Sequence, residues 1–306
     1  MPERTTAAGG FAFILDGSKT AGYLKSFSGG SVSADVIEEA PGPDGFAKKR
    51  IGAPRYQDFT VQVDTSMTGD LYDWINASLV SKSQRKSGAV VAHDFNYEAR
   101  SRREFFSALI TEVGFPACDA AAKDAAFLTV KFAPEYTRYT KASGKIATTA
   151  SGIQKAWLPS NFRFAIDGLD CTRVSKINAF TIKQTIAERM PGRIEFPNLT
   201  VWLPEASAAT WLAWHEEFVI GGMNSDDREK SGRLELLAPD LKETLLTIEF
   251  QNVGIFNITL PGTAAGDQIP MVSVDLYCER MALFTAKSAI AKRAVGKGIR
   301  TKRRSR

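Results

Sequence analysis

The chain contains the same residue pattern twice, and this repeat constrains its fold more than any other feature. The stretch FAFILDGSKTAG begins at Phe11, and about 150 residues later FRFAIDGLDCTR begins at Phe162. Aromatic residues occupy matching positions, and each alternating segment ends in Asp-Gly. A segment of domain length that recurs in one chain predicts two similar structural units in tandem.

The match continues beyond this first segment in the same order. FTVQV at 59–63 corresponds to LTVWL at 199–203, and both alternate as half-buried strands do. Three further matches follow: Lys-Ser-Gly at 86–88 with 230–232, EVGF at 112–115 with NVGI at 252–255, and FLTVKFAPE at 127–135 with MVSVDLYCE at 271–279. The shared order predicts a duplicated domain.

Each copy also contains one segment with helical periodicity. The positions of this face are Leu71, Trp74, Ile75 and Leu79 in the first copy, and Trp211, Trp214, His215, Phe218 and Val219 in the second. Residues spaced in this way share one face of a helix. We expect Leu71, Trp74, Trp211 and Trp214 to anchor the two helices in the core; the alternative is that the tryptophans form stacking platforms for a ligand.

The predicted fold class is mainly β with one amphipathic helix per domain, that is, two tandem β-barrel or sandwich domains. One helix cannot cover both faces of a large flat sheet, so a strongly curled sheet buries the alternating residues better. The expected parts are a flexible arm at 1–9, a first β domain at 10–136, a linker at 137–159, a second β domain at 160–285 and a basic tail at 286–306.

The first copy carries about ten residues that the second lacks, within a segment rich in Gly, Pro and charge. Such an extension on a repeated framework predicts a surface loop, at about 38–55. Its charged residues are the candidate contact site of the first domain: Glu38, Glu39, Asp44, Lys48, Lys49 and Arg50.

Charge is distributed unevenly. The formal net charge is +5, but the last twenty residues hold nine Lys or Arg and no acid, so the rest of the chain is mildly acidic. The candidate docking residues of this tail are Lys292, Arg293, Lys302, Arg303 and Arg304. Clustered cations can contact nucleic acid or an acidic protein surface, or can simply be solvated.

The sequence gives little support to catalysis. The three cysteines are far apart, and no Cys/His cluster or phosphate-binding motif occurs,. His93-Asp94 invites an acid–base interpretation, but no nucleophile motif accompanies it, so a polar strand end is favoured. We expect no enzyme, no cofactor and no metal, and, because no apolar run could span a bilayer, no membrane contact. The N-terminus lacks the apolar core of a signal peptide, which predicts a cytoplasmic chain at synthesis.

The order of these features resembles the T4-type tail tube proteins of contractile phages and their relatives in contractile injection systems. The resemblance rests on the Asp-Gly strand end, YLKSFSGGSVSADVIEEA, the long loop, YQDFTVQV and the Trp-centred DLYDWINASL. It implies small β-barrels with a flanking helix whose hairpins join into rings around a lumen. The loop at 38–55 would then contact the next ring.

The resemblance therefore implies a virion or particle structural protein that forms part of the inner tube or its junction with the baseplate. The duplication departs from the family and leaves two arrangements open: a hexamer with two fused tiers, or a trimer that forms one pseudo-hexameric ring. Expected partners are other copies and neighbouring tube, sheath or baseplate proteins, with DNA or protein as lumen cargo. Two alternatives remain, namely a tube initiator or hub adaptor that matches threefold to sixfold symmetry, and a tandem β module that binds a ligand such as a glycan.

Overall fold

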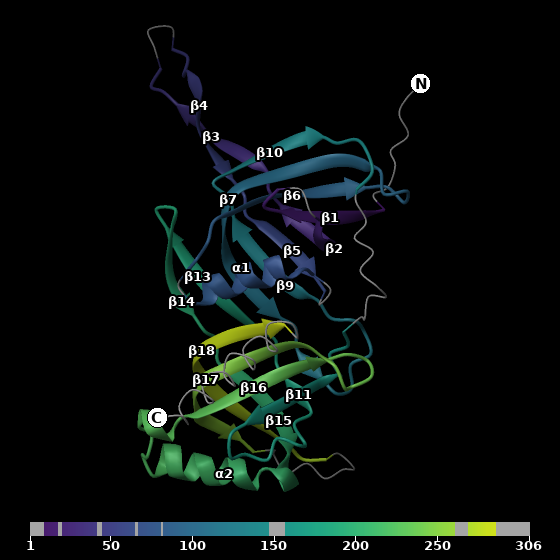
Figure 1. Cartoon of the computed structure of the whole chain (residues 1–306). Helices are drawn as coiled ribbons and strands as arrows, with labels where there is room; N and C mark the ends of the chain where they lie inside the picture. The colour runs from purple at the N-terminus through teal and green to yellow at the C-terminus, as the bar shows by residue number, and fades with distance from the viewer. Residues whose placement is uncertain are drawn as a thin grey trace, which may run out of the picture.

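The computed structural model describes residues 9–17, 20–41, 45–64, 67–80, 82–146, 157–260 and 269–285. Strands dominate this part of the chain, and the two large sheets occupy the upper and lower parts of Figure 1. The fold class predicted from the sequence, mainly β with a helix beside each barrel-like sheet, is confirmed.

The first large sheet closes into a six-stranded barrel. Its strands follow the order β7-β6-β1-β2-β5-β9, and β9 pairs back onto β7. Alternation explains the inside of the barrel, since Phe59, Val61 and Val63 of β5 are buried while the residues between them are not. The bounds are β1 (Gly10–Leu15), β2 (Thr20–Gly29), β5 (Phe59–Val63), β6 (Lys86–His93), β7 (Ala99–Phe115) and β9 (Leu128–Ala133).

The second large sheet places its strands in the order of the first. The order β11-β16-β17-β18-β15-β12 corresponds strand by strand to β1-β6-β7-β9-β5-β2, and within the described residues no pairing joins β12 back to β11. This likeness supports the predicted duplication. The bounds are β11 (Phe162–Ile166), β12 (Lys176–Ile177), β15 (Leu199–Pro204), β16 (Lys230–Leu237), β17 (Thr244–Thr259) and β18 (Met271–Thr285).

The register corrects one sequence match. Phe105 of β7 and Phe250 of β17 each face the glycine of the Lys-Ser-Gly motif on the neighbouring strand. Counting from these residues, Val113 corresponds to Ile258, not to Val253 as the match between EVGF and NVGI implied. The match between EVGF and NVGI was misleading, because a strand position accepts many different apolar residues.

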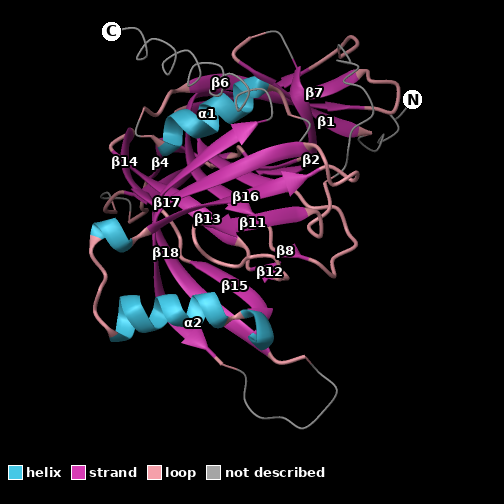
Figure 2. Ribbon diagram, turned by 60° about the horizontal axis from the view of Figure 1, so that its bottom comes forward, coloured by secondary structure: helices cyan, strands magenta, loops and turns pink. Residues whose placement is uncertain are grey.

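One helix packs beside each sheet (Figure 2). Helix α1 spans Gly69–Leu79, and α2 spans Ala209–His215 and continues in a π-helical turn at Glu216–Ile220. Short 3-10 turns at Glu205–Ser207 and Asp226–Arg228 flank α2. The residues expected to anchor the helices are all buried: Leu71, Trp74, Trp211 and Trp214.

The segment predicted as a surface loop is a regular hairpin. It consists of β3 (Val32–Glu38) and β4 (Lys49–Tyr56), which pair with each other and project from the barrel (Figure 1). Its counterpart is the hairpin of β13 (Phe180–Ala187) and β14 (Met190–Glu195). The strand register gives the correspondence between the two hairpins: Ser33 faces Arg55 in the first, and Lys183 faces Glu195 at the same place in the second. The hairpins nevertheless have different surroundings, since β13 belongs to the first sheet.

The predicted linker begins later than expected. Residues 136–141 form strand β10 (Tyr136–Lys141), which pairs with β7. The physical reason is cross-strand contact: the Tyr136 ring stacks on Phe106 at 4.3 Å, and Arg138 forms an ion pair with Glu104 at 2.6 Å,. Residues 147–156 of the predicted linker, the arm at 1–8 and the tail at 286–306 lie outside the described residues.

Candidate functional site

The two large sheets are joined by strand pairing along one seam, a feature that the sequence motifs did not predict. Strand β13 pairs with the end of β7, where Phe180 faces Phe115 and Lys183 faces Glu112. Strand β12 pairs in the same register with β8 (Cys118–Asp119). Residues 112–119 and 176–183 therefore form one antiparallel ladder, interrupted only in its middle. Each half of the chain completes the sheet of the other.

Apolar side chains fill the seam. The Phe115 and Phe180 rings stack with centroids 4.8 Å apart, and Ile182 and Cys118 are also buried. These residues belong to a core cluster that extends through both sheets. Burial raises the pKa of the Cys118 thiol to about 12, so this thiol is protonated at neutral pH and acts as a small apolar residue. The seam is therefore a continuous part of the core.

Polar contacts flank the seam. The Ser83 hydroxyl and the Gln184 side-chain amide lie 3.0–3.1 Å apart and bond to each other across it. Lys176 lies 3.8 Å from the Asp119 carboxylate. The Arg85 guanidinium binds Glu135 at 2.8 Å and also donates to the carbonyl of Arg189 at the turn between β13 and β14. The contacts of Gln184 and of the Arg189 carbonyl hold the β13–β14 hairpin against the first half of the chain.

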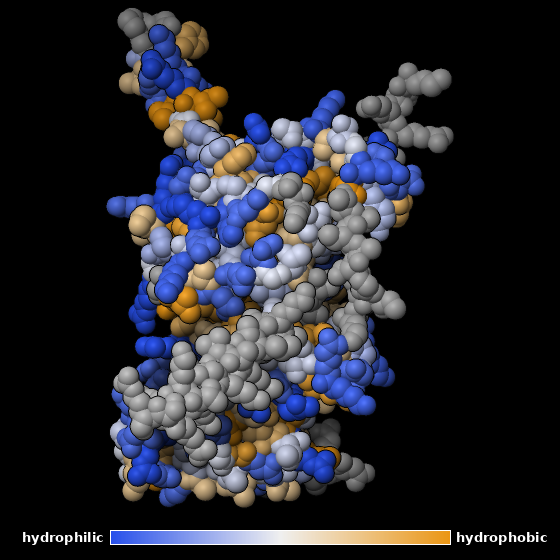
Figure 3. Space-filling model, in the orientation of Figure 1, coloured by the Kyte–Doolittle hydropathy of each residue, from blue (hydrophilic) through white to orange (hydrophobic). Residues whose placement is uncertain are grey.

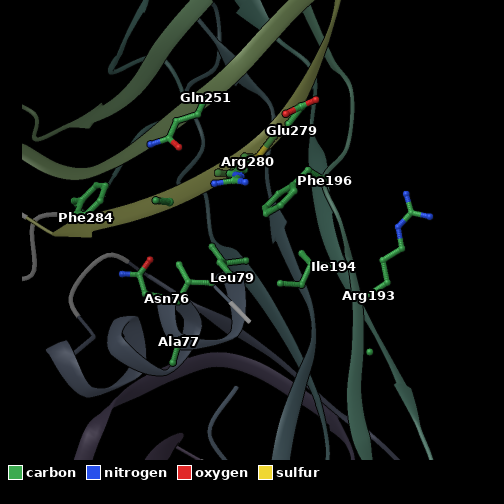
Figure 4. Close-up of a pocket in the computed structure, with 14 residues that line it drawn as sticks. Asn76, Ala77, Leu79, Arg193, Ile194, Phe196, Gln251, Glu279, Arg280 and Phe284 are labelled. Carbon is green, nitrogen blue, oxygen red and sulfur yellow. The ribbon is translucent and has the colours of Figure 1, made fainter. Parts of the chain in front are cut away.

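Helix α1 adds a contact between the halves. The Asn76 side-chain amide donates to the Leu283 carbonyl at 2.6 Å, and its oxygen accepts the Leu283 N–H at 2.9 Å. The amide thus takes the place of a neighbouring strand at the edge of β18. Figure 4 shows α1, β14 and β18 around a groove of about 850 Å³, with Asn76 and Leu79 opposite Ile194 and Phe284.

The predicted contact residues of the β3–β4 hairpin lie on its exposed surface. Lys49 pairs with Glu38 at 2.9 Å, and Arg50 pairs with Glu39 at 2.7 Å. The Lys48 carbonyl accepts the Glu39 N–H, and Asp44 lies outside the described residues. The structure brings these charges together as pairs within the hairpin. Apolar side chains accompany them (Figure 3), and the exposed ones are Val32, Val36, Ile37, Phe46 and Ile51.

The histidine–aspartate pair serves a turn. The Asp94 carboxylate accepts the N–H groups of Asn96 and Glu98 at 2.9 and 3.0 Å and binds Arg100. These hydrogen bonds, the Glu98 N–H first, hold the pKa of the Asp94 carboxyl below its usual range. The buried His93 ring stacks on Tyr97 at 5.0 Å, and its Nδ1 contacts the Asp94 backbone oxygen instead of the carboxylate. The arrangement therefore stabilises a tight turn after β6.

The tryptophans are not surface platforms. The indole N–H of Trp74 donates to the Gln84 carbonyl at 2.8 Å, and that of Trp211 to the Asp170 carbonyl at 2.9 Å. Both rings are fully buried, and Trp214 is 5% exposed. A ligand could not stack on them without displacing the core, which disfavours the glycan-binding interpretation.

The described residues contain neither a metal-binding cluster nor a membrane-spanning helix. No group of three or more His, Cys, Asp or Glu side chains among them could hold a metal ion. Among the same residues, no helix has the length and hydrophobicity to cross a membrane.

Several solved structures are similar to part of the chain. A chain from the extended sheath–tube complex of the extracellular contractile injection system PVC has 21% identity and a TM-score of 0.39, over 46% of this chain and 95% of that one. A chain from the tube-terminating cap of the anti-feeding prophage has 19% identity and a TM-score of 0.40, with the same coverage. A chain from the baseplate of the anti-feeding prophage has 12% identity and a TM-score of 0.30, over 41% and 92%. No protein-family model and no curated protein matches the chain.

Proposed function

We propose that this chain is a structural, non-enzymatic component of a contractile phage tail or contractile injection particle. It forms a ring that is part of the inner tube or of the junction between tube and baseplate. The family resemblance of the sequence and the geometry of the seam both support this function.

The observation that carries the proposal is the ladder between residues 112–119 and 176–183. It joins two barrel units of like strand order edge to edge by main-chain hydrogen bonds. An edge strand exposes unpaired N–H and C=O groups, and pairing with the next unit satisfies them. A unit that offers one edge and receives another can repeat such a contact until it closes on itself. The seam is thus one junction of a ring, formed within a single chain.

The unlike hairpins favour the junction with the baseplate over a repeated tube layer. The β3–β4 hairpin is longer than β13–β14 and projects freely, whereas β13 is incorporated into the first sheet. A layer that occurs once meets a different partner on each face, so its two copies are free to diverge. We therefore assign the chain to a tube initiator or baseplate adaptor, with tube, sheath or baseplate proteins as its neighbours and DNA or protein as the cargo in the lumen.

Electron microscopy of the purified full-length chain tests the proposal. We expect closed rings with a central lumen, alone or in short stacks, at micromolar concentration. Mass photometry of the same sample gives the fraction of chains assembled. A strictly monomeric protein at all concentrations, also in extracts that contain intact particles, would overturn the proposed function.

A further inference from the structure

We propose that a second copy of this chain binds head to tail, by repeating between chains the seam that already joins the two halves. This inference rests on the proposed function and specifies the partner and the surfaces. One surface lies on the second half (β17 and α2), and the complementary surface lies on the first half (β2, β3 and β10). We call them the tail surface and the head surface.

The tail surface contains an edge of β17 that pairs with no described strand, whereas the corresponding edge of β7 is paired with β13. On β7, residues 112–115 pair with β13 on one side, and residues 112–114 pair with β9 on the other. The register of Phe105 and Phe250 makes residues 257–260 their counterparts, and residues 257–259 pair with β18 on one side. On the other side they face no described strand. Leu260 is exposed there, whereas its counterpart Phe115 is buried under Phe180.

The head surface contains the strand that fits this edge. Residues 180–183 pair with β7. Their counterparts are residues 30–33. This correspondence follows from the neighbouring strands, because Phe27 faces Val61 in the first half as Ile177 faces Val201 in the second. Ile182 is 2% exposed at the seam, but its counterpart Val32 is 53% exposed. Transferring the register of the seam predicts that Val32 of one chain faces Ile258 of the next. Both members of the new pair are apolar, as Ile182 and Val113 are.

The helices show the same difference. Tyr72, Asn76 and Leu79 lie on one face of α1, at the spacing of successive turns; Asn76 binds β18 there, and Leu79 is 7% exposed. Trp74 and Trp214 align, so the corresponding residues of α2 are Leu212, Glu216 and Val219. Leu212 and Val219 are exposed, Val219 by 40%. An apolar face that is covered on one helix is therefore uncovered on the other.

Comparison of the two halves also identifies the element that would cover α2, namely β10. Strand β10 pairs with β7 as the second half of β18 pairs with β17, which makes Tyr139 the counterpart of Leu283. Leu283 is fully buried and receives Asn76, whereas Tyr139 is 66% exposed. The β10 edge away from β7 faces no described strand. In the assembly, α2 of one chain packs on β10 of the next.

Both surfaces are present on each chain and differ from one another, so the contact is heterologous and closes into a ring if the rotation permits. The two halves lie side by side along a strand edge, as neighbours in a single layer do. The arrangement thereby favours one pseudo-hexameric ring of three chains over six chains in two fused tiers.

Two variants test the interface. The tail variant is Leu212→Glu with Val219→Glu, and the head variant is Val32→Glu with Tyr139→Glu; all four side chains are exposed, so both variants should fold. Phe95→Glu, at an exposed turn outside both surfaces, is the matched control. Near-ultraviolet circular dichroism and melting temperature verify folding, and sedimentation velocity measures assembly.

We expect wild type and Phe95→Glu to form a species of three chains, and each surface variant alone to be monomeric. An equimolar mixture of the two variants retains one intact interface and should give a dimer, with an affinity at least tenfold above that of either variant for itself. Variants that assemble like wild type, a mixture that stays monomeric, or a six-chain ring would overturn the inference. In each of these cases wild-type rings remain visible, so the proposed function is tested separately.

Discussion

At the scale of single residues, Asn76 is the clearest example of a side chain that replaces a strand. Its amide donates to and accepts from the backbone of Leu283 at the edge of β18. Backbone groups at a covered edge need partners, and the planar amide offers one donor and one acceptor in the required arrangement. Helix periodicity alone could not identify this role, because Asn76 lies beside the predicted apolar face.

We predict that Asn76→Ala destabilises the chain by about 1–3 kcal/mol, the usual cost of leaving buried polar groups unpaired. Urea unfolding followed by tryptophan fluorescence measures the change. Asp73→Ala, an exposed position on the same helix, serves as control and should change stability by less than about 0.5 kcal/mol. Equal midpoints for the two variants would show that water replaces the amide without loss.

Residue patterns predicted the core better than its borders. Leu71, Trp74, Trp211 and Trp214 were recognised by spacing, and all are buried. Val219 fits the same apolar pattern yet is exposed. In the proposed assembly, β10 of the next chain would cover this part of α2.

At the scale of elements, the β3–β4 hairpin is a pair of strands that composition alone did not predict. Every residue of β3 is exposed, so the inside–outside alternation that reveals a half-buried strand is absent. Gly, Pro and charge suggested a loop, whereas cross-strand pairs and the ion pairs of Glu38 and Glu39 organise two strands. Strand β10 was not predicted either, because it forms by pairing with β7, which is distant in sequence.

We predict that the hairpin can be shortened without loss of the fold. Replacing residues 35–53 by the sequence of residues 185–193 gives the first hairpin the length of the second. The melting temperature should change by less than a few degrees, because β3 and β4 pair only with each other in the described chain and exposed ion pairs contribute little. Microscopy should still show rings, but the rings should no longer stack or dock. Loss of the rings themselves would instead assign the hairpin tip to the contact within a layer.

At the scale of the whole molecule, the sequence predicted two similar units, but neither the strand order of their sheets nor the exchange of strands between them. The strand order of the second sheet follows that of the first. The pairing of β13 with β7 depends on which edges meet in space, and the alternation of apolar residues does not specify that. Only the difference between Asn178-Ala179-Phe180 and Ser28-Gly29-Gly30 marks the place.

We predict that the chain unfolds in one cooperative transition, because the core cluster is continuous across the seam,. Differential scanning calorimetry should give a calorimetric enthalpy equal to the van't Hoff enthalpy. Phe180→Ala removes one ring of the stack with Phe115, should cost about 3–5 kcal/mol, and should separate the transitions of the two halves. Two resolved transitions in the unmodified chain would contradict a shared core.

The covalent connection between the halves also bears on how assembly responds to dilution. A junction formed within one polypeptide has a local concentration fixed by chain length and is independent of how much protein is present. In the proposed ring of three chains, half of the junctions between barrel units would already be made when each molecule finishes folding. Fewer bodies would have to meet for closure, so this layer would nucleate at a lower concentration than a layer assembled from separate single barrels.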